Sequence, residues 1–328
     1  MKKKITFKGI FKVLKDSFRG FGDDKVMKLS ASLAYFTIFS IAPMLIIVIF
    51  FADIFLSKDA IEGTVYRQIN GFVGSDAALQ IQQIIKSASL SGKSTVAAVV
   101  GFIALLVGAT TIFSEIQDSI NTIWNLKPKP KKGWLKMLIN RGLSFSVVVS
   151  LGFILLVSLV LNGLIEGLMG RLQERFPELT VVVLYIINIL ITFIVISSLF
   201  AIIFKVLPDA IIKWRDVTVG AMVTAILFMI GKFAITFYIG TSNVGSTYGA
   251  AASIVILLLW VYYSSVILYF GAEFTKAYAA SYGSSIYPNH YAVWVRNVEV
   301  EEKSGSLQSQ EEKKQQQNEQ TGDHITVT

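Results

Sequence analysis

The residues that could carry chemistry in this chain are few, and their types exclude several kinds of site. The chain has no cysteine and only two histidines, His290 and His324. Disulfides, thiolate nucleophiles and thiolate metal ligands are therefore excluded, and no HxH or HExxH spacing supports a histidine metal site. The sequence also lacks a P-loop, a dinucleotide fingerprint and a GxSxG motif. We therefore expect no catalytic residue, no metal and no cofactor, and predict that the chain is not an enzyme.

Acidic and amide side chains at helical spacing form the first candidate site. Glu115, Asp118 and Asn121 follow an apolar run at intervals of three residues, which predicts a shared helical face. Glu273 follows another apolar run at a similar depth. This candidate inner acidic cluster could act as a gate or handle protons. The alternative is that these carboxylates pair with nearby lysines and arginines, because charges at the ends of spans are usually solvated or paired.

A lysine inside an apolar run is the second candidate. Lys232 is the single charge between residues 217 and 272. A lysine at the centre of a spanning helix costs about 2.5–3.5 kcal/mol on insertion scales, so such residues often face a polar cavity. The alternative is that its stem extends towards the outer headgroups. Asn162 and Asn188 are its candidate partners, because both are predicted at a similar depth.

A proline inside the first apolar run is the third candidate. Pro43 cannot donate a backbone hydrogen bond to the carbonyl of Phe39. The hydroxyl groups of Thr37 and Ser40 could satisfy backbone groups that the proline frees. Broken helices often line transport sites, whereas a simple kink is the common outcome of an internal proline. Pro43 and Ser40 are therefore named as candidate gating residues.

These candidates all lie in or beside long uncharged runs. Of 328 residues, 53% are hydrophobic and 16% are charged, against about 25% charged in an average soluble domain. A helix needs about 20 apolar residues to cross a bilayer. A glycine-, serine- and asparagine-rich turn at 240–249 divides the last apolar stretch in two. We predict an all-α, polytopic membrane protein with six transmembrane helices at about residues 29–52, 94–114, 142–165, 179–204, 217–239 and 250–272.

The distribution of lysine and arginine sets the predicted orientation. One side of the predicted topology carries 23 of these residues and the other side carries six. The N-terminus and C-terminus are therefore predicted to be cytoplasmic. The remaining predicted parts are a 29–275 transmembrane domain, a 1–28 amphipathic segment, a 276–298 cytoplasmic juxtamembrane segment and a 299–328 disordered tail. Segment 1–28 lies on the membrane surface or, alternatively, packs on the bundle.

Several motifs resemble one family in the same order along the chain. They are LAYFTIFSIAP (33–43), GATTIFSEIQDSINTIW (108–124), LP (207–208), GA (220–221) and YGAAASIVILLLWVYYSSVILYFGAEF (248–274). Together they resemble the YihY/BrkB membrane proteins over about residues 5–290. The resemblance implies a bacterial inner-membrane protein with six helices, and some members of the family are linked to virulence or serum resistance.

The same family has been labelled ribonuclease BN, and that label conflicts with this sequence. A metal-dependent nuclease needs clustered histidines and aspartates, which are lacking here. The first hypothesis is a transporter or flippase-like protein for a lipid-linked or small anionic substrate. The second is a non-transporting envelope scaffold or assembly partner, and the third, a membrane ribonuclease, is disfavoured. Membrane lipids are the expected partners, a homo-oligomer stays open, and nucleic acid is not expected.

Overall fold

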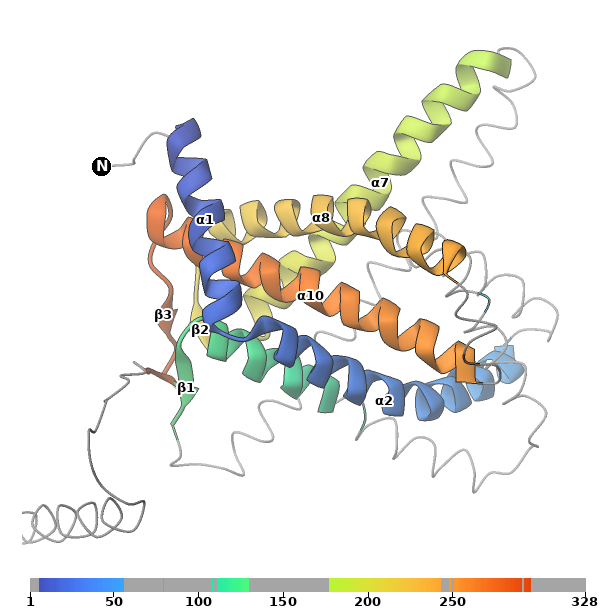
Figure 1. The fold of residues 1–328 in the computed structure, drawn as a ribbon, viewed down its shortest axis with the longest axis horizontal. Coiled ribbons are helices and arrows are strands. Elements are labelled where there is room, and N and C mark those ends of the chain that lie inside the picture. Colours follow the sequence, from blue (N-terminus) through green and yellow to red (C-terminus); the bar gives the residue numbers. More distant parts are fainter. Residues whose placement is uncertain are drawn as a thin grey trace, which may run out of the picture. The chain divides into compact units, whose positions relative to one another are not determined.

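The computed structural model describes residues 6–55, 79, 108, 111–129, 177–242, 248, 251–290 and 292–295. All of the helices and strands described belong to one compact unit, Met1–Trp294. Its long helices are α2 (Val26–Phe55), α7 (Pro177–Val206), α8 (Trp214–Thr241) and α10 (Ala252–Ser281), and a shorter helix, α1 (Phe7–Asp23), precedes them (Figure 1). A further helical segment covers residues 111–123.

The long helices have the composition that a bilayer requires. Within the described residues, three helices are long and apolar enough to cross a membrane: Ile186–Val206, Trp214–Thr241 and Ile254–Ser281. The stretch Val26–Ser40 is a shorter apolar helix. The prediction of a helical membrane protein is therefore confirmed. The count of six spans and the cytoplasmic termini stay predictions, because span 142–165 and most of span 94–114 lie outside the described residues.

Helix α10 is the common packing partner of the bundle, since α1, α2 and α8 all pack on it. Its contact with α8 depends on two glycines. A Cβ on Gly220 would lie 1.9 Å from Thr275 Oγ1, and a Cβ on Gly271 would lie 2.0 Å from Thr224 Oγ1. Each threonine hydroxyl donates to the carbonyl four residues earlier in its own helix, so no polar group is stranded in the seam. Small residues of this kind let spanning helices approach closely.

Helix α1 lies on α10 through a stripe of small residues and through two aromatic rings, since the ring centroids of Phe18 and Phe21 lie 4.9 Å and 6.1 Å from that of Phe270. Val13 and Ser17 are buried, and the flanking Gly9 and Gly20 rest on Tyr282 and Glu273 of the α10 region. Phe11 and Phe18 are each 66% exposed. The contact with the bundle therefore combines small residues with the rings of Phe18 and Phe21, whereas Phe11 stays exposed. The predicted position of this aromatic face on the membrane surface stays a prediction.

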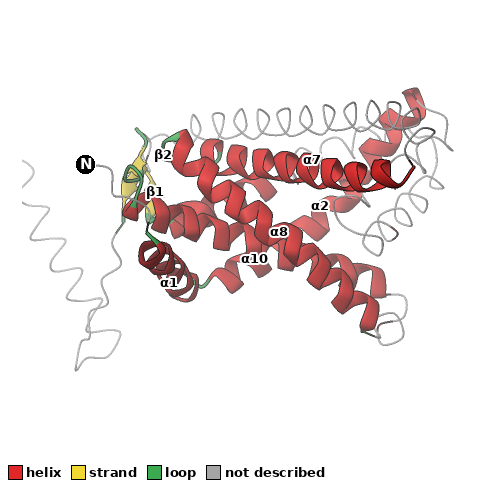
Figure 2. Ribbon diagram, turned by 90° about the horizontal axis from the view of Figure 1, so that it is seen from above, coloured by secondary structure: helices red, strands yellow, loops and turns green. Residues whose placement is uncertain are grey.

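Short strands close one end of the bundle, which we call the strand end. Strand β1 (Leu126–Pro128) pairs antiparallel with β4 (Ala292–Trp294), and β2 (Ala210–Ile211) pairs antiparallel with β3 (Tyr287–Pro288). Figure 2 shows β1 and β2 together beside the helix ends. The ladders tie the segment after α10 to two segments far from it in sequence. In the predicted topology the strand end is the cytoplasmic end.

Two details of the helices differ from the sequence-based prediction. Helix α2 continues through Pro43 to Phe55, so the alternative of a helix broken at this proline is wrong. The hydroxyls of Thr37 and Ser40 donate to the carbonyls of Leu33 and Phe36, not to the carbonyl of Phe39 that the proline frees. Helix α10 extends from the predicted end at residue 272 to Ser281, which places Glu273 inside the helix rather than after it.

Candidate functional site

Three buried carboxyl groups gather at the strand end, and they differ in how their oxygens are satisfied. Asp209 is 5% exposed, Asp216 is 1% exposed and Glu273 is 2% exposed. Burying a carboxylate is costly unless it is paired and hydrogen-bonded. The hydrogen-bond partners of each carboxyl group therefore indicate whether it has a structural role or could exchange a proton.

Asp209 lies in the turn between α7 and β2 and is held by the helical segment 111–123. Gln117 Nε2 donates to Asp209 Oδ1 at 3.2 Å, and Asn121 Nδ2 donates to Oδ2 at 3.0 Å. The backbone N–H of Asp209 returns a bond to Asn121 Oδ1 at 2.9 Å. The Asp209 carbonyl accepts from the backbone N–H of Asn289 at 3.0 Å. Asp209 thus joins three segments of the chain, with both carboxylate oxygens satisfied.

Asp216 lies in the first turn of α8, where an acidic side chain is favoured by the helix dipole. Its Oδ2 accepts from the backbone N–H of Ser284 at 2.8 Å and from the Ser284 hydroxyl at 2.9 Å. Its Oδ1 lies 3.9 Å from Arg215 Nε. A Cβ on Gly283 would lie 2.5 Å from this carboxylate, so the glycine provides the space it occupies. Asp216 therefore fixes the turn that follows α10.

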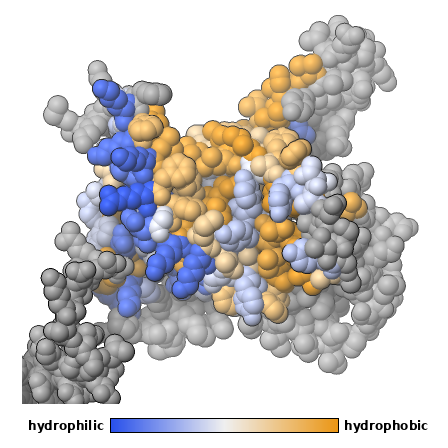
Figure 3. Space-filling view, in the orientation of Figure 1, coloured by the Kyte–Doolittle hydropathy of each residue, from blue (hydrophilic) through white to orange (hydrophobic). Residues whose placement is uncertain are grey.

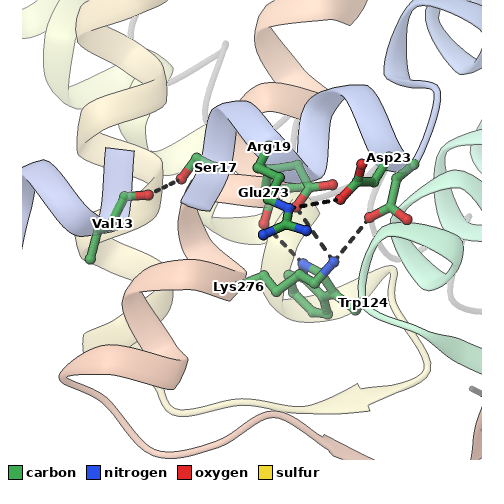
Figure 4. A network of polar contacts seen from close by, with 9 residues as sticks. Val13, Ser17, Arg19, Asp23, Trp124, Glu273 and Lys276 are labelled. Carbon is green, nitrogen blue, oxygen red and sulfur yellow. Dashed lines mark hydrogen bonds and ion pairs between the residues drawn. The ribbon is translucent and has the colours of Figure 1, made fainter. Parts of the chain in front are cut away.

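Glu273 has a different environment, where α10 crosses α1 (Figure 4). Its Oε2 lies 3.5 Å from Lys276 Nζ, and the same ammonium lies 3.0 Å from Asp24 Oδ2. Its Oε1 is buried and has no hydrogen-bond partner. A Cβ on Gly20 would lie 2.5 Å from Oε2, so the carboxyl group rests directly on the backbone of α1. One of its oxygens therefore lacks a donor.

The residues of the predicted inner acidic cluster have different partners. Asn121 contacts Asp209. Glu273 pairs with Lys276, which agrees with the alternative that these acids pair with nearby basic residues. Glu115 is half-buried and Asp118 is exposed on the helical segment 111–123. A shared role of Glu115, Asp118, Asn121 and Glu273 as one acidic cluster stays a prediction. Residues six apart in a helix differ by about 120° in direction, so Glu115 and Asn121 lie on different sides of this segment.

Lys232 lies in the outer half of α8 in the predicted topology and is half-buried. One helical turn towards the strand end, Phe228 contacts aromatic rings on two other helices. Its ring centroid is 5.8 Å from that of Phe200 on α7 and 6.1 Å from that of Trp260 on α10, both in edge-on geometry. We call these three rings the aromatic layer. The aromatic layer joins α7, α8 and α10 one helical turn from Lys232, on the side of the strand end.

The other predicted polar residues have modest local roles. Ser40 is buried against Gly108, where a Cβ would lie 2.8 Å from its hydroxyl oxygen. Asn188 is exposed on α7 and accepts a bond from Thr192 Oγ1 at 3.3 Å. Asn162 lies outside the described residues. The partnership of Lys232 with Asn162 or Asn188 stays a prediction, as does a gating role for Pro43 and Ser40.

Sequence reasoning missed most of the strand-end residues. Asp209 lies in the short connection between α7 and α8 and Asp216 in the first turn of α8, where exposed charges are ordinary, and nothing local marks them as buried. Lys276 is the first residue of the predicted 276–298 juxtamembrane segment, where it was not distinguished from the other cytoplasmic basic residues. The signal that could have found it is the three-residue spacing from Glu273, because residues i and i+3 share a helical face.

Figure 3 shows hydrophilic residues gathered where α1 and the strand end lie and hydrophobic residues over the long helices. This division agrees with the comparison to known proteins. The family described as Virulence factor BrkB matches residues 17–290. A UPF0761 membrane protein of Stenotrophomonas maltophilia is 29% identical over 265 residues, which is 79% of this chain and 59% of that protein.

Other curated relatives give similar values. A UPF0761 membrane protein of Xanthomonas axonopodis pv. citri is 28% identical over 269 residues, covering 80% of this chain and 60% of the relative. One from Ralstonia nicotianae is 26% identical over 262 residues, covering 78% and 56%. The chain therefore spans under two thirds of the length of these relatives. No solved structure matches it.

Proposed function

The chain belongs to the Virulence factor BrkB family of bacterial membrane proteins, and from that premise we propose that it is a transporter or flippase-like protein of the plasma membrane. The substrate is a lipid-linked or small anionic molecule. The observation that carries this proposal is Lys232, a half-buried cation within an apolar helix. A cation in that position attracts an anion entering the membrane, because the low dielectric strengthens the attraction.

The aromatic layer supports the same proposal. Phe228 is in edge-on contact with Phe200 and Trp260 on the strand-end side of Lys232, so these rings link α7, α8 and α10 there. An anion that reaches the ammonium from the outer half must displace these rings to continue. Aromatic rings turn about two side-chain torsions, so such a layer can open with limited movement of the helices. Lys232 would then be the binding group and the aromatic layer the barrier.

A second candidate function is a non-transporting envelope scaffold. The observation that favours it is the exposed apolar face of α1, formed by Ile10, Phe11 and Phe18. An exposed apolar surface of this kind commonly binds a membrane or a protein partner. We also propose that the chain is not a ribonuclease. In the part of the chain that the structure describes, no group of three or more histidine, cysteine or acidic residues could hold a metal ion.

Flux across liposomes separates the two candidates. The purified full-length chain is reconstituted in vesicles that contain either a fluorescent anionic phospholipid, to measure flipping, or entrapped chloride or phosphate, to measure release. We expect flux of at least one class of probe. K232A should reduce it by about tenfold or more, the change that a loss of about 1.4 kcal/mol in anion binding produces. K232R should retain most of the flux, because it keeps the charge.

K213A is the matched control, since Lys213 is an exposed cation immediately before the same helix and its removal should leave the flux unchanged. Flux that K232A and K213A reduce equally would contradict the role of Lys232. No flux of any probe by correctly folded protein, together with reproducible capture of one partner by a photo-crosslinker at position 11, would favour the scaffold.

A further inference from the structure

The contact between α1 and α10 contains a buried acid with an unsatisfied oxygen. Glu273 is 2% exposed, and its Oε1 has no hydrogen-bond partner. Two other polar side chains labelled in Figure 4, Ser17 and Trp124, donate elsewhere. Ser17 Oγ donates to the carbonyl of Val13 at 2.7 Å, and Trp124 Nε1 donates to the carbonyl of Ala272 at 3.0 Å. Neither donor is therefore free to stabilise a negative charge on Oε1.

The charged groups around Glu273 come from each element packed on it. On its own helix, Lys276 lies 3.5 Å away, and Asp24, after α1, shares this ammonium at 3.0 Å. Asp23 pairs with Arg19 at 3.6 Å, and both of these side chains are largely exposed. Lys25 and Lys28 are exposed at the start of α2. Glu115 is half-buried on the helical segment 111–123.

The balance of charge in this contact is unfavourable when every acid is ionised. Lys276 then faces two carboxylates, and two carboxylates that share one site resist double ionisation. Asp24 has the shorter ion pair and a side chain that is 19% exposed, so water and the ammonium both stabilise its charge. Glu273 has the longer ion pair and almost no exposure. A proton on Glu273 leaves Lys276 and Asp24 as a balanced pair.

We propose that Glu273 is a reversible proton-binding site that latches α1 onto α10. With the proton bound, the neutral carboxyl group rests on the backbone of α1 at Gly20, and the stripe formed by Gly9, Val13, Ser17 and Gly20 stays packed. Without the proton, the carboxylate needs hydration at Oε1, and water reaches that oxygen only when α1 moves away. The latch opens as the proton leaves.

The inference goes beyond the proposed transport, because the latch can be observed with no substrate present. Helix α1 packs mainly on α10, where Val13 lies with Phe274 and Tyr278 and the rings of Phe18 and Phe21 contact that of Phe270. Loss of the Glu273 contact therefore loosens this packing of α1 at Gly20. That helix carries the exposed aromatic face and several lysines, so its release changes how the strand end meets the membrane or a partner.

The distance between two spin labels measures the latch directly. The chain has no cysteine, so only introduced cysteines react with the label. Phe11 and Ala280 are exposed, and they lie at the same end of the contact because Gly9 rests on Tyr282. The full-length F11C/A280C variant is labelled in nanodiscs of neutral phosphatidylcholine. Electron–electron resonance then measures the distance distribution from about pH 5 to about pH 9, the range over which ordinary and buried carboxyl groups release protons.

We expect one short distance at acidic pH and a growing population of longer distances as the pH rises. Adding E273Q should keep the short distance at every pH, because the carboxamide is neutral and nearly the same shape as the protonated acid. D23N is the matched control, since it removes an exposed carboxylate one turn from Gly20 on the same helix, and it should leave the transition unchanged. K276Q should move the transition to higher pH by about one unit or more, because the cation that opposes protonation is lost.

Three results would overturn the proposal. The first is a wild-type distance that does not change over this pH range. The second is a pH transition that E273Q retains unaltered. The third is a transition that K276Q moves to lower pH, which remains decisive even if E273Q does not fold.

Discussion

Two regions of the strand end bury carboxyl groups to the same extent and treat them in opposite ways. In the turns around Asp209 and Asp216, amide, hydroxyl and backbone donors reach the carboxylate oxygens at 2.8–3.2 Å. At the crossing of α1 and α10, Glu273 shares one ammonium with Asp24, and one of its oxygens has no hydrogen-bond partner. In the first region the carboxyl groups join segments of the chain through hydrogen bonds. In the second region Glu273 is buried without enough donors to stabilise a negative charge, so a bound proton is favoured.

The largest effect should come from removing a satisfied acid. D209A leaves the side-chain amides of Gln117 and Asn121 buried without their acceptor. We expect a loss of about 2–4 kcal/mol of stability, because each stranded donor costs about 1–3 kcal/mol. Thermal unfolding in detergent micelles measures it. D209N keeps an acceptor oxygen and should lose less, and equal losses in the two variants would show that the hydrogen bonds are not the cause.

An intermediate effect should come from the space that Glu273 occupies. G20A places a methyl group 2.5 Å from Glu273 Oε2, so α1 must move or the buried carboxyl group must turn. We expect a loss of about 1 kcal/mol, within the range for overpacking. G22A is the matched control on the same helix, since nothing lies within 4 Å of a Cβ there. That variant should gain about 0.5–1 kcal/mol from helix propensity, and a gain of similar size in G20A would contradict the close contact.

The smallest effect on stability should come from neutralising Glu273. E273Q replaces a group that already carries a proton, so we expect a change of less than about 1 kcal/mol at neutral pH. D216N should be more harmful, with a loss of about 1–3 kcal/mol, because it removes charge-assisted bonds from Ser284. Parallel unfolding measurements on the two variants compare the regions directly. A larger loss in E273Q than in D216N would reverse the distinction between them.

The fold was predictable where composition alone decides it. Long uncharged runs predicted the helices that became α2, α7, α8 and α10, because a spanning segment must satisfy its backbone internally. The extension of α10 to Ser281 was not predictable from hydrophobicity, since Glu273 and Lys276 interrupt the apolar run. They are compatible with the helix because the ammonium of Lys276 pairs with Asp24 and also lies 3.5 Å from Glu273 Oε2. The end of an apolar run is not the end of a helix.

The candidate site was predictable only in part, because its contacts cross long stretches of chain. Glu273 was identified from its place at the end of an apolar run, but Asp24, which shares the ammonium of Lys276 with it, precedes it by about 250 residues. Asn121 was identified from its spacing to Glu115 and Asp118, although its actual partner is Asp209. Gln117, one helical turn before Asn121, shares that contact and was missed. Local spacing shows which side chains share a face, and it cannot show what that face meets.

The central claim is that Glu273 holds a proton in the folded protein, whereas the carboxyl groups of Asp209 and Asp216 accept hydrogen bonds from amide, hydroxyl and backbone donors. Infrared difference spectroscopy of the full-length chain in nanodiscs at neutral pH tests it directly. Our account predicts that the wild-type spectrum contains a C=O stretching band of a protonated carboxyl group, and that E273Q removes this band while D209N and D216N keep it. A wild-type spectrum without the band, or a band that E273Q leaves in place, would contradict the account.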